Sequence, residues 1–350
     1  MSCIGIIANP QSGKDIRRLV ALASSFSNHE KLLILRRVLA GLVAAGVDEI
    51  LAFHDAGALG ASALEASRDG PRKNRVKMRL IDVGARGEAE DSTRAAAQMR
   101  KEGAICIIVL GGDGTSRAVA KGCGKCPLVP LSTGTNNAFP QNWEGTVAGL
   151  GAGLYARKPR RYTDQVMESK RLTARFHDGT EIALVDVALV NEAFAGSKAV
   201  WDIERIESLA LTRCQPGGLG LSALGASLDP IGPEEPEGLW IEFGPPEGRR
   251  KGGKVLSPIG PGLLASADVR ACRRIAQEEV VEIIAKSGQV LAFDGERERV
   301  LSPGERVRVS LDFRGPRVLH IPGVLERAAV TGHLKEPALN GLQRKQNGKN

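Results

Sequence analysis

Short apolar runs alternate with helical patterns along the first half of the chain. Strands buried on both faces of a sheet have nearly continuous apolar runs, and five such runs predict strands, at residues 3–8, 49–53, 76–83, 104–110 and 127–131. Between them apolar residues recur with helical spacing, near residues 15–26, 29–45, 57–68, 87–102 and 115–122. Alternating strands and helices indicate a parallel sheet with right-handed crossovers. We therefore expect a Rossmann-like α/β domain over residues 1–155.

After about residue 155 the pattern changes to short β-branched runs separated by glycine and proline. Within residues 171–194 such runs flank Asp178-Gly179, a dipeptide typical of hairpin turns. Similar runs predict an all-β, mostly antiparallel sandwich over residues 156–325. Two glycine- and proline-rich segments of this part are expected to be mobile loops, near residues 215–238 and 244–262. The last residues, 326–350, are expected to form a basic, disordered tail.

Composition narrows the possible partners. The 350-residue chain has a formal net charge of +8 at pH 7 and an isoelectric point of about 9.3, which suits a polyanion such as a nucleotide, a nucleic acid or a membrane surface. Aromatic residues make up only 4% of the chain, which is few for a surface that stacks single-stranded bases. No stretch is apolar for long enough to span a membrane, and the N-terminus lacks a signal-peptide pattern. We expect a cytoplasmic protein that binds neither nucleic acid nor a membrane.

The six cysteines are scattered and include one C-x-x-C pair, Cys123 and Cys126. A structural zinc site would need a second such pair or nearby histidines. The sequence favours reduced cysteines in a cytosolic protein, and a redox role for this pair is the alternative.

Three polar loops directly follow strands of the predicted sheet. They are NPQSGK at 9–14, GGDGT at 111–115 and STGTNN at 132–137. Because the carboxyl ends of parallel strands meet at one edge of a sheet, we expect these loops to lie side by side. Glycines let a phosphate approach backbone N–H groups, and a helix N-terminus favours negative charge. The first loop is not a P-loop, since Ala8 and Asp15 replace the required Gly and Ser or Thr. Together the loops favour a nucleotide site.

The aspartate of the second loop, Asp113, is the candidate for chemistry. A carboxylate in such a turn either holds Mg²⁺ or accepts a proton from an attacking hydroxyl. The alternative is an ordinary strand-to-helix turn, in which Asp113 only caps the following helix.

In this order the three motifs resemble those of the NAD kinase and diacylglycerol kinase superfamily. LVNEAF (189–194) is similar to the Asn-Glu strand motif of NAD kinases, and FDGERERVLSPGERVRV (293–309) to a late Asp-Gly hairpin. The nearest resemblance is to the acetoin-catabolism protein X group, which is ATP-NAD kinase-like. It covers about residues 3–320, and it implies an N-terminal α/β domain, a C-terminal β-sandwich and an active site between them.

The resemblance also implies roles for individual residues. Asp113 would be the catalytic group, as base or as organiser of a metal. Mg²⁺ would arrive with ATP and would not be held by a cage of protein ligands. The acceptor-binding residues would be Asn191, Glu192 and Asp294, although Asp294 has the alternative role of a simple turn residue. The nucleotide and phosphate site would comprise Asn9, Ser12, Gly13, Lys14, Gly111, Gly112, Gly114, Thr115, Thr133, Gly134, Thr135 and Asn136.

The implied reaction is ATP + NAD → ADP + NADP, catalysed by a homo-oligomer. The chain departs from NAD kinases in their GSTAYS-like loop, because its nearest candidate, residues 257–268, lacks the Thr and Tyr. The acceptor therefore stays open between NAD and another hydroxyl compound, such as a lipid, a polyol or a small metabolite. Residues 215–225 are either an acceptor lid or a glycine-rich crossover. A nucleotide-binding regulator without turnover is the alternative from another functional class.

Overall fold

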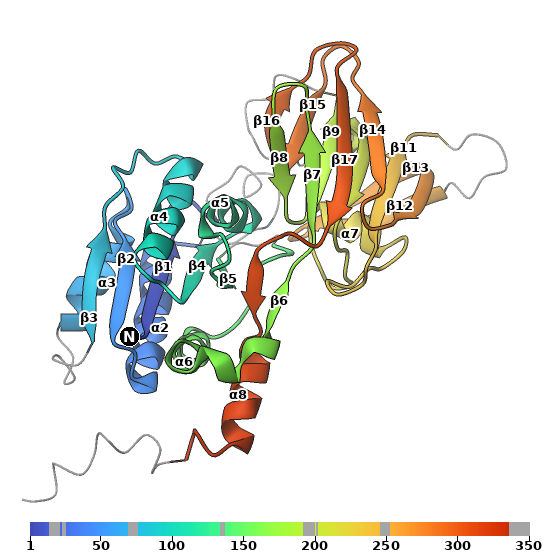
Figure 1. Ribbon diagram of the computed structural model, residues 1–350. Helices are drawn as coiled ribbons and strands as arrows, with labels where there is room; N and C mark the ends of the chain where they lie inside the picture. Colours follow the sequence, from blue (N-terminus) through green and yellow to red (C-terminus); the bar gives the residue numbers. More distant parts are fainter. Residues whose placement is uncertain are drawn as a thin grey trace, which may run out of the picture.

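The chain forms an α/β domain and a second domain of antiparallel strands (Figure 1). The computed structural model describes residues 1–13, 22, 26–68, 76–133, 137–191, 200, 202–245 and 253–335. Both predicted fold classes are confirmed.

The first domain is built on a sheet whose five N-terminal strands are parallel. These strands confirm the five predicted ones, and they are β1 (Cys3–Ala8), β2 (Glu49–Phe53), β3 (Lys77–Ile81), β4 (Cys106–Gly111) and β5 (Leu128–Ser132). The order across the sheet is β3-β2-β1-β4-β5, followed by two short strands from later in the chain, β18 (Arg317–Leu319) and β6 (Val166–Glu168). Every residue of β1 and β4 is buried, as the continuous apolar runs require.

Four of the predicted helices are confirmed, and they are α2 (Asn28–Ala45), α3 (Leu59–Arg68), α4 (Ala89–Lys101) and α5 (Asp113–Cys123). The helix expected near residues 15–26 falls mostly outside the described residues. A further helix, α6 (Gly145–Arg157), was not predicted, because its four glycines lower its helix propensity. No helix of the described part is long and apolar enough to cross a membrane.

The glycines of α6 have a packing role against α2. A Cβ atom at Gly149 would lie 2.1 Å from the carbonyl oxygen of Val38, and one at Gly41 would lie 2.3 Å from that of Thr146. The two backbones therefore touch directly. Tertiary packing here outweighs the low intrinsic propensity of the sequence.

The second domain contains two antiparallel sheets. The larger has, in spatial order, β12 (Gly253–Gly260), β13 (Leu263–Ile275), β11 (Gly238–Phe243), β10 (Ile206–Leu211), β9 (Asp186–Val190), β15 (Val290–Phe293) and β16 (Glu296–Val300). The smaller has β14 (Val280–Ile284), β17 (Arg306–Asp312), β7 (Arg171–Arg175) and β8 (Thr180–Ala183). The predicted hairpin at Asp178-Gly179 joins β7 and β8.

A hydrophobic core fills the space between the two sheets, with Leu172 and Val309 from one and Phe293 from the other. The opposite face of the larger sheet is also buried, partly beneath the short helix α7 (Leu221–Ala226). The segments near 215–238 and 244–262, expected to be mobile loops, contain α7 and β12, whose Leu224 and Val255 belong to that second core. In the described parts of these segments, the glycines and prolines lie between regular helices and strands instead of forming long mobile loops.

The last strand and helix of the described chain pack on the first domain, whereas the sequence predicted that the second domain extends to residue 325. β18 pairs in parallel with β5, and α8 (Ile321–Val330) packs on α6, with Ile321 and Val324 in the core of the first domain. Two 3₁₀ turns, η1 (Pro159–Arg161) and η2 (Thr163–Gln165), lead into β6, and a third, η3 (Ile203–Arg205), precedes β10. The expected tail is thus helical to Val330, and 336–350 lie outside the described residues.

The α2–α6 contact predicts the effect of one added methyl group. Gly149→Ala should lower the free energy of unfolding by about 1–3 kcal/mol, since overpacking against backbone outweighs the gain in helix propensity. Gly179→Ala is the matched control, because its Cβ would meet no atom within 4 Å. Urea unfolding followed by circular dichroism measures both variants. Equal midpoints would contradict the backbone contact.

Candidate functional site

The GGDGT turn places Asp113 at the first residue of α5, directly after β4. Gly112 is the N-cap, so Asp113 does not cap this helix with its side chain. Its carboxylate instead reaches the loop after β5. Oδ1 accepts a hydrogen bond from the backbone N–H of Phe139 at 2.8 Å, and both carboxylate oxygens lie within 3.2 Å of the backbone nitrogen of Ala138. The simple capping role is therefore not what the structure shows.

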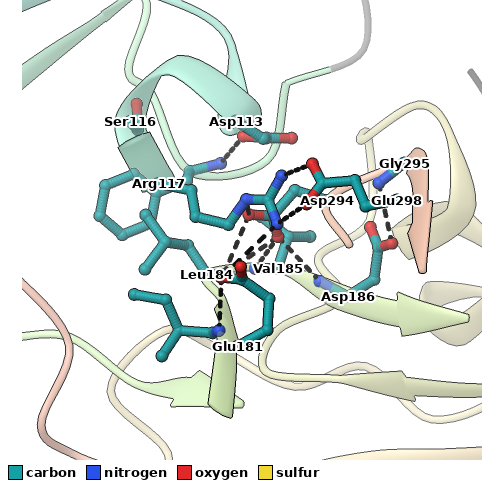
Figure 2. Close-up of polar contacts among 12 residues, drawn as sticks. Asp113, Ser116, Arg117, Glu181, Leu184, Val185, Asp186, Asp294, Gly295 and Glu298 are labelled. Carbon is teal, nitrogen blue, oxygen red and sulfur yellow. Dashed lines mark hydrogen bonds and ion pairs between the residues drawn. The ribbon is translucent and has the colours of Figure 1, made fainter. Parts of the chain in front are cut away.

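Asp294 occupies the turn between β15 and β16. Asp294 and Gly295 have φ angles of 51° and 78°, the left-handed region that a type I′ turn requires. The carboxylate points inward and accepts hydrogen bonds from the backbone N–H groups of Leu184 at 3.0 Å and Val185 at 2.8 Å (Figure 2). Asp294 is thus both a turn residue and a buried acid.

The two aspartates line one small cavity between the domains. Asp186, Gly220 and Ser222 contribute to the same cavity. The exposed fractions are 9% for Asp113 and 5% for Asp294. Burial, with a further contribution from the negative charge of Asp294, raises the pKa of Asp113 to about 7. Burial also raises the pKa of Asp294, against the opposing effect of Arg117 and the backbone N–H groups.

Arg117, which sequence reasoning missed, links the domains beside this cavity. It lies one helical turn after Asp113 on α5, and its Nε is 3.4 Å from Oδ2 of Asp294. Its terminal nitrogens form a two-pronged contact with the Glu298 carboxylate of β16 (Figure 2). Its position four residues after Asp113 was the available signal, because such residues share a helix face.

The loop after β1 joins the same edge of the sheet. Nδ2 of Asn9 donates to Oγ1 of Thr115 at 2.8 Å, and the hydroxyl groups of Ser12 and Thr133 are 2.8 Å apart. The three predicted loops therefore meet. Four predicted residues lie outside the described part of the chain, namely Lys14, Gly134, Thr135 and Asn136.

A buried lysine supports the first loop from below. Nζ of Lys31 donates to the carbonyl oxygens of Asn9, Pro10 and Ser12 at 3.0, 2.9 and 2.7 Å. These bonds turn three carbonyl groups toward α2 and place a positive charge beneath the loop. The sequence analysis did not single out Lys31.

The glycines of GGDGT allow close approach by polar groups. A Cβ atom at Gly111 would lie 2.5 Å from the side chain of Thr115, and one at Gly112 would lie 2.9 Å from Oδ1 of Asn137. At Gly114 the nearest atom would be Oε1 of Glu296, at 3.5 Å. The turn is thus packed between the loop after β5 and the second domain.

Asn191 is not brought to this site. It follows the end of β9 farther from Asp186, about 16 Å along the strand. Its Oδ1 accepts a hydrogen bond from Gln289 at 2.6 Å, and its neighbour Glu192 lies outside the described residues. Asn191 therefore lies beside Gln289 and not beside Asp113.

The nearest candidate for the GSTAYS-like loop contributes one residue to the cavity. Residues 257–268 belong to the β12–β13 hairpin, from which Ile259 lines the cavity. The segment between β10 and α7 contributes Leu219 and Gly220, and Ser222 follows in α7. Residues 215–225 thus form a wall of the cavity.

The environment of the C-x-x-C pair disfavours the thiolate form of both cysteines. Cys123 and Cys126 are buried, and burial raises their thiol pKa values to about 11 and 12. Reactive cysteines need the opposite shift, because the thiolate is the nucleophile. The structure therefore favours the reduced, packed cysteines that the sequence indicated.

Comparisons with known proteins agree with this fold. Residues 4–149 match the ATP-NAD kinase N-terminal domain, and residues 170–314 match the acetoin catabolism protein X C-terminal domain. The crystal structure of yeast NADH kinase complexed with NADH has a TM-score of 0.50 at 13% identity, covering 96% of this chain and 88% of that one, a likeness of fold. Acetoin catabolism protein X of Cupriavidus necator is 35% identical over 349 residues, covering 97% of this chain and 96% of that protein. The chain therefore belongs to the acetoin catabolism protein X family, with an NAD kinase-like fold.

Proposed function

We propose that this protein is an ATP-dependent kinase of an NAD-like acceptor, and that its first candidate substrate is the 2′-OH of the adenosine ribose of NAD. The NAD kinase-like first domain supports a phosphotransferase. The observation that carries the proposal is the position of Asp113, a buried carboxylate at a helix N-terminus that faces an interdomain cavity. A cytoplasmic homo-oligomer is part of the same proposal.

In this mechanism Asp113 takes the proton from the acceptor hydroxyl. A general base works best when its pKa lies near the working pH, and burial raises that of Asp113 to about 7. Backbone N–H groups of Ala138 and Phe139 hold the carboxylate in one orientation. Phosphoryl transfer needs mainly positioning and charge neutralisation, which the N-terminus of α5 and the glycine-containing loops supply.

The carboxylates of the cavity suit Mg²⁺, which prefers oxygen ligands and binds proteins through one or two carboxylates plus substrate phosphates. Among the described residues no three His, Cys, Asp or Glu side chains are grouped so as to hold a metal. Asp294 would hold Mg²⁺ together with the triphosphate of ATP, and Asp113 would join it only in the alternative in which Asp113 organises the metal instead of acting as the base. Bound there, the ion would neutralise phosphate charge.

A second candidate is a nucleotide-binding regulator without turnover. It is supported by the name of the curated relative, which refers to acetoin catabolism and to no reaction. The buried Asp113 favours the kinase, because burying an acid without a chemical role lowers stability for no gain. Another hydroxyl acceptor remains the alternative within the kinase proposal.

The kinase proposal predicts NADP formation. The pure protein with ATP, Mg²⁺ and NAD should form NADP, detected with an NADP-specific dehydrogenase. Asp113→Asn should lower kcat by at least about a hundredfold, the usual contribution of a general base. Asp164→Asn, at an exposed carboxylate paired with Arg327, is the control and should keep full activity. Full activity of Asp113→Asn would refute the role of Asp113.

The raised pKa of Asp113 also predicts a pH profile. Only the ionised carboxylate accepts a proton, so kcat should rise with pH and level off above about 7. Initial rates between pH 5.5 and 9 at saturating substrate measure this. A rate that is constant from pH 5.5 to 7.5 would contradict the proposed base.

The same shift predicts a stability effect with a defined sign. The pKa of Asp113 is higher in the folded protein than its usual 3.8, so the folded state binds more protons between about pH 4 and 7. Its stability contribution is therefore complete at low pH and is lost as pH rises. Asp113→Asn should raise the free energy of unfolding at pH 8 by about 2–4 kcal/mol, at about 1.4 kcal/mol per pKa unit. Urea unfolding should show this gain shrinking toward pH 4. An unchanged or lower stability at pH 8 would contradict the buried, strained carboxylate.

A further inference from the structure

Among the described residues, the Nε atom of one buried arginine near the two acids finds no hydrogen-bond partner. Arg213 follows β10 and is 6% exposed. Its guanidinium lies over the ring of Phe139, 5.0 Å from the ring centre, and none of the described carboxylates lies within ion-pair distance of it. Burial lowers the pKa of Arg213 to about 10, with the charges of Asp113 and Asp294 opposing that effect. A charged group in this state is costly unless a ligand pairs with it.

Arg213 lines a pocket of about 370 Å³ beside the aspartate cavity. Its other walls come from the loop after β5 and the segment leading into α7. We call it the arginine pocket, lined by Asn137, Ala138, Pro140, Gln141, Asn142, Trp143, Arg213, Gln215, Pro216, Gly217, Gly218 and Ser222. Ser222 also lines the aspartate cavity, and the N–H of Ala138 binds Asp113. A molecule in this pocket is therefore adjacent to the proposed base.

The lining defines the ligand chemistry. The planar donors of an arginine match the oxygens of a phosphate or carboxylate. Side-chain amides of Asn137, Gln141 and Gln215 add neutral donors and acceptors, and Trp143 adds a flat apolar surface. None of the described residues that line this pocket is acidic. The volume falls in the range of small-molecule sites.

We propose that the arginine pocket binds the anionic group of the acceptor, so that the acceptor is a hydroxylated phosphate or carboxylate compound. Arg213 binds that group directly and selects anionic acceptors over neutral ones. Calling the ligand an acceptor rests on the proposed kinase function, whereas anion binding does not. The anion has two possible sources, the diphosphate of a dinucleotide or a small phosphorylated or carboxylated metabolite.

Anion binding is tested first, without turnover. Inorganic phosphate is titrated into the full-length protein while tryptophan fluorescence is recorded, with calorimetry alongside. We expect saturable binding, weakened at least tenfold in Arg213→Gln and unchanged in Arg306→Gln, an exposed arginine of β17. Trp143→Phe should lose the fluorescence change and keep the calorimetric signal.

A second variant tests the proposal independently, in case Arg213→Gln does not fold. Asn142→Glu adds a carboxylate at an exposed position of the pocket and leaves the core intact. It should weaken phosphate binding at least tenfold. Wild-type affinity in both variants, or no phosphate binding by the wild type at millimolar concentration, would overturn the proposal.

Turnover then identifies the source of the anion. ADP release is measured with NAD, glycerol phosphate, glycerate or neutral glycerol as acceptor. Turnover of NAD identifies the dinucleotide, and turnover of glycerol phosphate or glycerate identifies a small anion. In either case Arg213→Gln should raise the acceptor KM at least tenfold and leave the KM for ATP unchanged. Equal use of neutral glycerol would overturn the selection of anions. No turnover with any acceptor would refute the kinase function. Anion binding by the pocket would then be decided by the phosphate titration alone.

Discussion

The contact of Arg117 with Asp294 and Glu298 is the interaction on which the site depends. Arg117 belongs to the first domain, and both acids belong to the hairpin of β15 and β16 in the second. Because Arg117 and Asp113 lie one turn apart on α5, the contact that joins the domains also sets where Asp294 lies relative to Asp113. Removing one partner of such a buried pair leaves a charge uncompensated and costs about 3–5 kcal/mol. Domain docking and assembly of the cavity are therefore one event.

The buried charged residues of the site lower the stability of the folded protein. Asp113 and Asp294 are acids buried beside one cavity, and Arg213 is a base buried near them that pairs with no carboxylate of the described residues. Backbone N–H groups orient each acid, yet burial still raises both pKa values. Strain of this kind persists only where the surrounding fold over-determines the geometry, and it is concentrated at functional sites. The apolar surface buried by helices α2 and α6 and in the core between the β-sheets offsets the cost of burying these charges.

Sequence patterns predicted the features of the fold that depend on residues close together in the chain. The strands β1 to β5 and the meeting of three loops followed from continuous apolar runs and from the rule that parallel strands end at one edge. Lys31, Arg117 and Arg213 were missed, because their roles come from partners 19 to 181 residues away. Helix α6 was missed since its glycines matter only when α2 lies against it. The run at residues 317–319 was assigned to the sandwich, because so short a strand does not show in the sequence which sheet it joins. Asn191 was predicted from a motif resemblance, and it lies beside Gln289, beyond the end of β9 that is farther from the cavity.

The two sides of the site are formed by different parts of the chain. The proposed donor side consists mainly of loops in the first domain, shaped by close-packed glycines and by carbonyl groups held on Lys31. The proposed acceptor side combines the loop after β5, whose Ala138 binds Asp113, with the segment between β10 and α7, which carries Arg213. Changing that segment alters charge and shape in the arginine pocket while Asp113 keeps its backbone partners at Ala138 and Phe139. Under the proposed function, a fold of this design would retain one phosphoryl-transfer geometry while its acceptor changes, and the residues near Arg213 would determine which acceptor is used.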